Sequence, residues 1–269
     1  MGRPRFRVGT VKLPEASYPF RRRDRVGFSL VELLVVVAVL ALLAALLLAV
    51  LPGVRERGRR SVCRGNLRQF ALAIHLYGTD HRDLLPEGRH PARTAIYLPL
   101  VHTNTARALA SYAGSSNILD CPNVRPMLVG SNAWRWPYER DSLQLGYLYL
   151  GGRGPHRWEA TGGPVTTPWV SPTRLSEDPQ SLIAVDLTYA APCVSRIVIA
   201  HGRTGFVVRT SRLGQGDAAG YVGEALANVG GGHGAHLDGS VEWKGRRQLR
   251  WYRGAYEGPT DNSVCMAAW

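Results

Sequence analysis

The sequence predicts an α+β protein, in which a long N-terminal helix packs on an antiparallel β-sheet domain. Three observations support this fold class. An apolar run near the N-terminus has the length of a membrane-crossing helix, and a helical stripe of apolar residues follows it. Most of the 30 glycines and 17 prolines lie beyond residue 85, among short β-prone runs. The helix should therefore have a transmembrane half and an amphipathic half.

The membrane-crossing segment is predicted for residues 28–51, where only Ser29 and Glu32 interrupt an apolar run. As a helix it is about 36 Å long, which is enough to span a bilayer. A helix in a soluble core would carry a polar face, and none exists between Leu33 and Leu51. An ordinary signal peptide has an apolar region of only about 7–15 residues. We therefore expect one single-pass membrane helix.

The amphipathic half is predicted for residues 52–78. Pro52 and Gly53 should bend or break the helix at the membrane edge. Beyond them, apolar residues recur every three or four positions, as on one face of a helix. The members of this stripe are Cys63, Leu67, Phe70, Ile74 and Tyr77. This face should pack on the domain formed by residues 79–269.

The strands are predicted from short β-prone runs bounded by Gly, Pro or Ser. These runs are Leu145–Leu150, Leu182–Val185, Arg196–Ala200 and Phe206–Arg209. Asp238-Gly239 stands between two further β-prone segments and predicts a hairpin with a two-residue type I′ turn. An antiparallel sheet is the expected product.

The four cysteines are Cys63, Cys121, Cys193 and Cys265, and they lie far apart in the sequence. Without a C-x-x-C pair, or histidines at the spacing of a zinc module, a metal–cysteine site is not expected. An exported chain could form two disulfides, with three possible connectivities. The inward-facing Cys63 is either a small buried hydrophobe or half of a disulfide, and Cys121 is the favoured partner.

The formal charge of +13 is unevenly distributed. Eight basic and two acidic side chains precede residue 28, so the remainder carries +7. A basic surface of that size is usually a solvated one. A nucleic-acid partner is therefore allowed but not favoured.

The chain begins with a basic leader, residues 1–27, and the motif GFSLVEL follows from Gly27 to Leu33. This N-terminal region resembles the signal of type IV prepilins and type II secretion pseudopilins. The resemblance implies that a prepilin peptidase cuts between Gly27 and Phe28 and methylates the new amine of Phe28. It also places the leader in the cytoplasm, the helix in the inner membrane, and the domain in the periplasm or at the cell surface.

In this resemblance Glu32 is the assembly residue. A carboxylate near the hydrocarbon costs a few kcal/mol unless a partner or a function compensates. The new amine of Phe28 on a neighbouring subunit supplies a cation of that kind, and the pair would fix the register between subunits. The implied partners are the peptidase and other pilin-like subunits, joined through the N-terminal helix.

Two further elements resemble one branch of pilin-like proteins. The first consists of Cys63–Gln69, Tyr77–Asp80, Leu85–Pro86 and Leu119–Pro122. The second is the C-terminal tag H-x9-DG, which Gly232–Trp243 resembles. Its residues here are His233, His236, Asp238 and Gly239, and Asn228 stands where the tag has histidine.

A search for catalytic motifs finds no G-x-S-x-G elbow, H-E-x-x-H or Walker loop, so we expect no enzyme and no cofactor. A metal site on His233, His236 and Asp238 is not favoured, because this segment is a hairpin turn. The pseudopilin resemblance also implies a calcium site, for which Asp217, Glu224 and Asp238 are weak candidates as oxygen ligands.

The predicted function is that of a structural subunit, assembled into a type II secretion or type IV pilus-like structure. A first alternative is a binding module for DNA or polysaccharide, which would use the mixed basic and aromatic segments Trp134–Trp136 and Arg250–Arg253. A second is a signal-anchored enzyme that uses His233 and His236.

Overall fold

A computed structural model describes residues 27–88, 100–125, 142–154, 157–161, 169–191, 196–203, 205–210, 218–255 and 264–269. The chain divides into two compact units between Leu47 and Leu48. We describe each unit by itself. The second unit holds the β-sheets.

Helix α1, Leu30–Asp80, is continuous over 51 residues. Of the bend or break predicted at Pro52, the break does not occur, because the helix passes through this residue without interruption. Proline has no backbone N–H and leaves the carbonyl four residues earlier without its helical partner, which a helix tolerates when other contacts hold it. The helix ends in a turn where Arg82 and Asp83 both have positive φ, and the Asp83 N–H bonds to the Gly78 carbonyl.

The described strands form three antiparallel sheets. The first contains β11 (Val241–Gly245), β10 (Gly231–His236), β6 (Leu182–Asp186) and β3 (Tyr147–Tyr149), in that order. The second contains β5 (Trp169–Val170), β4 (Arg157–Thr161), β12 (Trp251–Ala255), β13 (Val264–Ala268), β7 (Thr188–Ala191), β8 (Arg196–Gly202) and β9 (Gly205–Thr210). The third pairs β1 (Leu100–His102) with β2 (Ser142–Gln144).

Three short helices complete the described elements. They are α2 (Thr103–Tyr112), the 3-10 helix η1 (Ser116–Leu119) and α4 (Ala218–Asn228). Together with α1 and the sheets they make the predicted α+β arrangement, which is confirmed. The predicted strands are found as β3, β6, β8 and β9, with ends shifted by a few residues.

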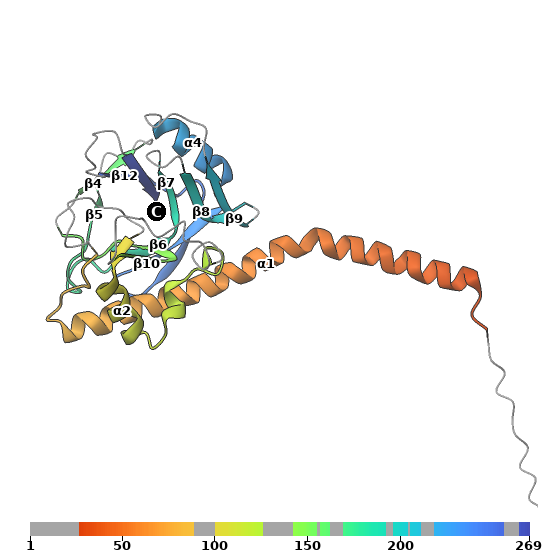
Figure 1. Cartoon of the computed structure of the whole chain (residues 1–269), viewed down its shortest axis with the longest axis horizontal. Coiled ribbons are helices and arrows are strands. Elements are labelled where there is room, and N and C mark those ends of the chain that lie inside the picture. The colour runs from red at the N-terminus through yellow and green to blue at the C-terminus, as the bar shows by residue number, and fades with distance from the viewer. Residues whose placement is uncertain are drawn as a thin grey trace, which may run out of the picture. The chain divides into compact units, whose positions relative to one another are not determined.

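The seven-stranded sheet is buried on both faces around β8. Ile197 and Ile199 join a core with α4, whereas Val198 and Ala200 join the larger core that includes α1. This split follows from the alternation of side chains along a strand. Helix α4 lies beside β8 and β7 (Figure 1).

The predicted apolar stripe on α1 is confirmed over most of its length. Cys63, Leu67, Phe70 and Ile74 are all fully buried in the larger core. The Phe70 ring lies 6.4 Å from the ring of Tyr147 and 5.8 Å from that of Tyr149, between centroids. The second half of α1 is thus part of the domain core.

The predicted hairpin is also confirmed, but its turn type is wrong. β10 and β11 pair from Gly231 opposite Gly245 to Ala235 opposite Val241. Of the two central residues only Gly239 has positive φ, at 81°, and its N–H bonds to the His236 carbonyl. This is a type I turn closed by a left-handed glycine, with a three-residue loop. The Asp238 carboxylate stabilises it by accepting from the Ser240 N–H.

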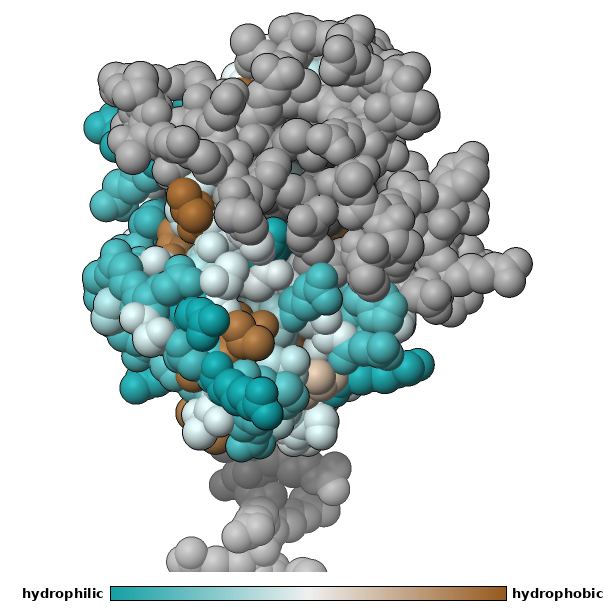
Figure 2. All heavy atoms as spheres, turned by 90° about the vertical axis from the view of Figure 1, so that its left-hand side faces the viewer, coloured by the Kyte–Doolittle hydropathy of each residue, from teal (hydrophilic) through white to brown (hydrophobic). Residues whose placement is uncertain are grey.

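The outer surface of the domain differs from its core. On the face shown in Figure 2, the described residues are mostly hydrophilic, and hydrophobic groups are isolated. Scattered apolar groups of this kind are normal for a soluble surface.

Candidate functional site

The N-terminal end of α1 carries a capping box. The Glu32 N–H donates to Ser29 Oγ at 3.1 Å, and the Ser29 N–H donates to Glu32 Oε2 at 2.9 Å. This reciprocal pair satisfies two backbone donors that a helix start otherwise leaves open. Gly27 and Phe28 precede the helix and are exposed. Glu32 therefore has a structural partner within its own chain.

The first half of α1 presents apolar side chains all round. All of its large hydrophobic residues are exposed, for example Leu47 at 72% and Leu30 at 78%. An 18-residue window of this helix has a mean hydropathy of 3.4 and is unburied. By length and composition, α1 can cross a membrane.

A second candidate site lies inside the domain, where Cys63 meets Cys121. Cys63 belongs to α1, and Cys121 follows η1. Their sulfur atoms are 2.9 Å apart, and both side chains are fully buried. A disulfide has an S–S distance of about 2.05 Å. The structure thus confirms that the two thiols meet but leaves them unbonded, so the disulfide stays a prediction.

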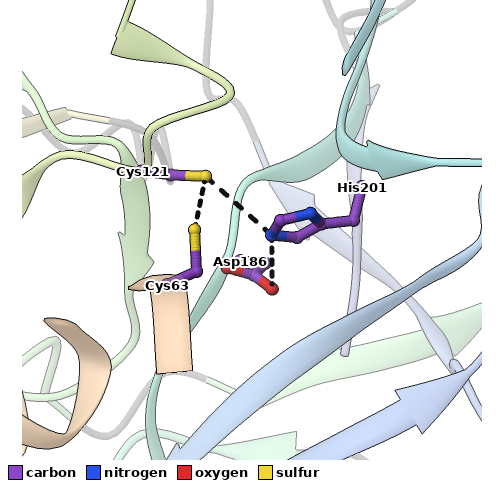
Figure 3. A group of neighbouring side chains, drawn as sticks. All are labelled: Cys63, Cys121, Asp186 and His201. Carbon is purple, nitrogen blue, oxygen red and sulfur yellow. Dashed lines mark hydrogen bonds and ion pairs between the residues drawn. The ribbon is translucent and has the colours of Figure 1, made fainter. Parts of the chain in front are cut away.

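His201 and Asp186 adjoin the thiols (Figure 3). His201 Nε2 is 3.3 Å from Asp186 Oδ2 and 3.9 Å from Cys121 Sγ. One ligand-type atom from each of the four residues lies within 4.8 Å of the other three. Both His201 and Asp186 are buried. We call Cys63, Cys121, Asp186 and His201 the buried cluster.

The two sheets position the histidine and the aspartate. Asp186 is the last residue of β6, and the chain enters β7 in the other sheet two residues later. Regular alternation along β8 would turn His201 toward the α4 side with Ile197 and Ile199. The pairing of β8 with β9 shifts register between Ile199 and Gly202. Such a bulge redirects a side chain, and His201 faces the cluster instead.

Hydrogen bonds hold His201 on the Nδ1 side of its ring. Its Nδ1 lies 2.7 Å from Glu56 Oε1. Glu56 also accepts from Arg60 Nε at 3.0 Å and from Asn123 Nδ2 at 2.9 Å. The imidazole orientation is therefore fixed by α1 and by the segment after η1.

Asp186 is held by β10 but is only partly satisfied. Its Oδ2 accepts from the His233 N–H at 2.7 Å and lies 2.8 Å from His233 Nδ1. Its Oδ1 is buried and has no hydrogen-bond partner among the described residues. A buried carboxylate oxygen without a donor is costly. This atom is the unsatisfied group of the cluster.

The charges of the cluster shift its proton affinities. Burial by itself would lower the pKa of His201, but the Asp186 carboxylate and the hydrogen bonds raise it to about 12. Burial would raise the pKa of Glu56, yet hydrogen bonds from His201, Asn123 and Arg60 lower it to about 2. The hydrogen bond between the thiols lowers the pKa of Cys121 to about 6 and, with burial, raises that of Cys63. In this state one imidazolium is shared by two carboxylates.

An aromatic side chain closes one side of these groups. The Trp243 ring lies 4.7 Å from the His233 ring and 5.8 Å from the His201 ring, between centroids. The Arg60 guanidinium lies 4.3 Å above Trp243. The close approach of β10 to this ring requires Gly231, since a Cβ there would lie 2.4 Å from it. The tryptophan thus shields the cluster from that direction.

Comparison with known proteins gives a family match near the N-terminus and a partial match to a secretion protein. Residues 22–48 match the family described as "Prokaryotic N-terminal methylation motif". A 61-residue stretch is 33% identical to the type II secretion system core protein G of Pseudomonas aeruginosa. The chain therefore carries a prepilin-type N-terminal motif and is similar to a type II secretion protein over part of its length. The stretch covers 23% of the chain and 43% of that relative, so the chain spans less than half of the relative's length. No solved structure matches.

Residues of the C-terminal tag occupy different places in the domain. His233 holds Asp186 in the buried cluster, whereas His236 bonds to the Gln180 carbonyl and to Glu242. Asn228 donates to the Glu224 carbonyl at the end of α4. Asp238 and Gly239 shape the turn. The tag therefore serves the fold at several points and forms no single site among the described residues.

Two of the three candidate calcium ligands contact other side chains. Glu224 faces Arg209 across 4.0 Å, and Asp238 accepts from Gln180. Asp217 lies outside the described residues. Calcium binding by this set stays untested.

The aromatic segments of the binding-module alternative give it little support. Trp134–Trp136 lies outside the described residues. In the second segment, Trp251 is buried, and Tyr252 stacks on Trp269 with centroids 4.4 Å apart. These two rings therefore pack within the domain.

Sequence reasoning missed Glu56, Asp186 and His201. For Glu56 a signal existed, because extending the apolar stripe backward in steps of three and four passes through Arg60 and reaches Glu56. An acidic residue on a buried helix face needs a partner. Asp186 and His201 carry no comparable local signal.

Proposed function

We propose that this chain is a structural subunit of a type II secretion or type IV pilus-like assembly. A prepilin peptidase cuts it between Gly27 and Phe28 and methylates the Phe28 amine. The helix beginning at Phe28 sits in the inner membrane and then joins other pilin-like subunits. The domain after Leu51 lies in the periplasm or at the cell surface.

The match of residues 22–48 to the methylation motif carries this proposal. The exposed apolar half of α1 supports it, because a surface of that size needs lipid or other helices around it. The Ser29–Glu32 capping box adds a physical detail. It starts the helix directly behind the proposed new N-terminus and holds the Glu32 carboxylate in the first turn, where the Phe28 ammonium of a neighbouring subunit would pair with it. Both matches point to a structural component rather than to an enzyme.

The N-terminal mass of the protein purified from its native membrane tests the proposal. A chain beginning at methylated Phe28 supports the pilin pathway. Gly27→Leu should block processing, because a bulky side chain replaces hydrogen at the cut. Gly53→Leu is the matched control, since a Cβ at Gly53 meets open space, and should be processed normally. A wild-type chain that retains residues 1–27 would show a permanent anchor instead.

A further inference from the structure

We propose that Cys63, Cys121, His201 and Asp186 form a tetrahedral site for a divalent transition metal of the zinc type. This inference does not depend on processing or assembly. The four residues supply two sulfurs, one imidazole nitrogen and one carboxylate oxygen. That donor set suits zinc, and the sulfurs exclude calcium and magnesium, which take oxygen ligands.

The spacing of the ligand atoms agrees with such a site. A zinc ion bound at about 2.3 Å to sulfur and about 2.0–2.2 Å to nitrogen and oxygen separates its ligands by roughly 3.3–3.8 Å. The distance from His201 Nε2 to Asp186 Oδ2 is 3.3 Å, and that from Cys121 Sγ to His201 Nε2 is 3.9 Å. The two sulfurs, at 2.9 Å, would move apart by about 0.8 Å to reach this spacing.

The surroundings of the imidazole are those of a metal-bound histidine. Such a histidine uses one ring nitrogen for the metal and donates the other N–H to a carboxylate, which fixes its tautomer. Here Nδ1 of His201 faces Glu56, and Nε2 faces the cluster. Arg60 and Asn123 in turn hold Glu56. The outer contacts of the site are thus already in place.

Asp186 supplies the observation that a disulfide leaves unexplained. A Cys63–Cys121 bond would use the sulfurs alone and would leave the buried Asp186 Oδ1 without a partner among the described residues. A cation bound at Oδ2, the oxygen at ligand spacing, would compensate the negative charge that Oδ1 shares. The His233 N–H and ring meanwhile hold Oδ2 in place.

The occupied site would join four separate segments of the domain. Cys63 lies on α1, Cys121 follows η1, Asp186 ends β6 and His201 lies on β8. Ligands brought together only by folding make metal affinity a part of the folding free energy. We therefore assign the site a structural role, consistent with the burial of all four side chains.

The first experiment measures metal in the full chain, purified from membranes in detergent without chelators. The proposal is supported if the chain holds one zinc and if the number of reactive thiols rises by two when a chelator removes the metal. A metal-free chain whose mass shows a Cys63–Cys121 disulfide overturns it. Each result is decisive, because a disulfide and a metal compete for the same two sulfurs.

The second experiment adds Co²⁺ to the reduced full chain without oxygen. A 1:1 complex with thiolate-to-cobalt charge-transfer absorption is expected, and absence of uptake overturns the proposal. Cys63→Ser and His201→Gln should each weaken binding at least tenfold, whereas Cys193→Ser and Cys265→Ser, the chain's other cysteines, should bind as wild type. Asp186→Asn keeps a side chain of the same shape, so this variant should still fold, and circular dichroism checks that it does. If this variant retains the wild-type circular dichroism and binds cobalt as tightly as wild type, Asp186 is no ligand.

Discussion

The two halves of α1 share one continuous backbone but differ in what surrounds them. In Leu30–Leu51 the large apolar side chains point in all directions and are exposed. In the second half, the stripe residues Cys63, Leu67, Phe70 and Ile74 lie on one face and are fully buried against the domain, whereas Leu72 on the other side is exposed. The first half is apolar all round and suits lipid or a bundle of like helices, whereas the second half is apolar on one face and suits packing on one sheet. The side-chain pattern therefore distinguishes an exposed apolar half from a half that packs on the domain.

The largest effect should come from the charge of Glu32 in the first half. Glu32→Gln keeps a capping-box residue but removes the charge, and we expect assembly to be lost. Ser29→Ala is the matched control, because it breaks the capping box and leaves the carboxylate, and it should assemble. Both variants should insert and be processed. Filament or pseudopilus yield from cells gives the readout, and normal assembly of Glu32→Gln would falsify the pairing of Glu32 with the Phe28 amine.

The second effect concerns the second half of the helix. Phe70→Ala removes a fully buried ring from between Tyr147 and Tyr149, and it should lower the free energy of unfolding of the domain by about 3–5 kcal/mol. Leu72→Ala is the control on the other side of the same helix, where the side chain is 58% exposed. Its effect should stay within about 0.5 kcal/mol. Denaturant unfolding of the full chain in detergent measures both, and equal losses would contradict the one-sided packing.

The smallest effect is expected at the boundary between the halves. Pro52→Ala restores a backbone N–H for the Leu48 carbonyl and removes a residue that is unfavourable inside a helix. Amide exchange of residues 48–56 should slow. The free energy of unfolding of the domain should change by less than about 0.5 kcal/mol, because the substitution touches no core contact. A larger change would mean that the two halves unfold as one cooperative unit.

Much of the fold could be predicted because its signals are local. The stripe from Cys63 to Ile74 follows the period of a helix, and the hairpin around Gly239 follows from its own dipeptide. The turn type was beyond reach, since Asp-Gly also suits a type I turn with a left-handed glycine. The passage through Pro52 was also missed, because a proline disfavours a helix but does not forbid one.

The buried cluster could not be predicted, because its members are distant in sequence. Cys63 and Cys121 are 58 positions apart, and Glu56 meets His201 across 145. Spacing rules for metal sites look for ligands within a few residues of each other. The orientation of His201 also depends on a register shift in β8, which no residue in that strand predicts.

The junction between β6 and β7 has a consequence for how this domain can vary. Leu187 alone separates Asp186, in one sheet, from Thr188, in the other. Because side chains alternate along a strand, a single residue inserted here would turn a whole strand over and move its buried side chains to the opposite face. Length changes among relatives should therefore avoid this point and gather in the surface loops. A junction of constant length would be a better mark of this domain than any of its individual side chains.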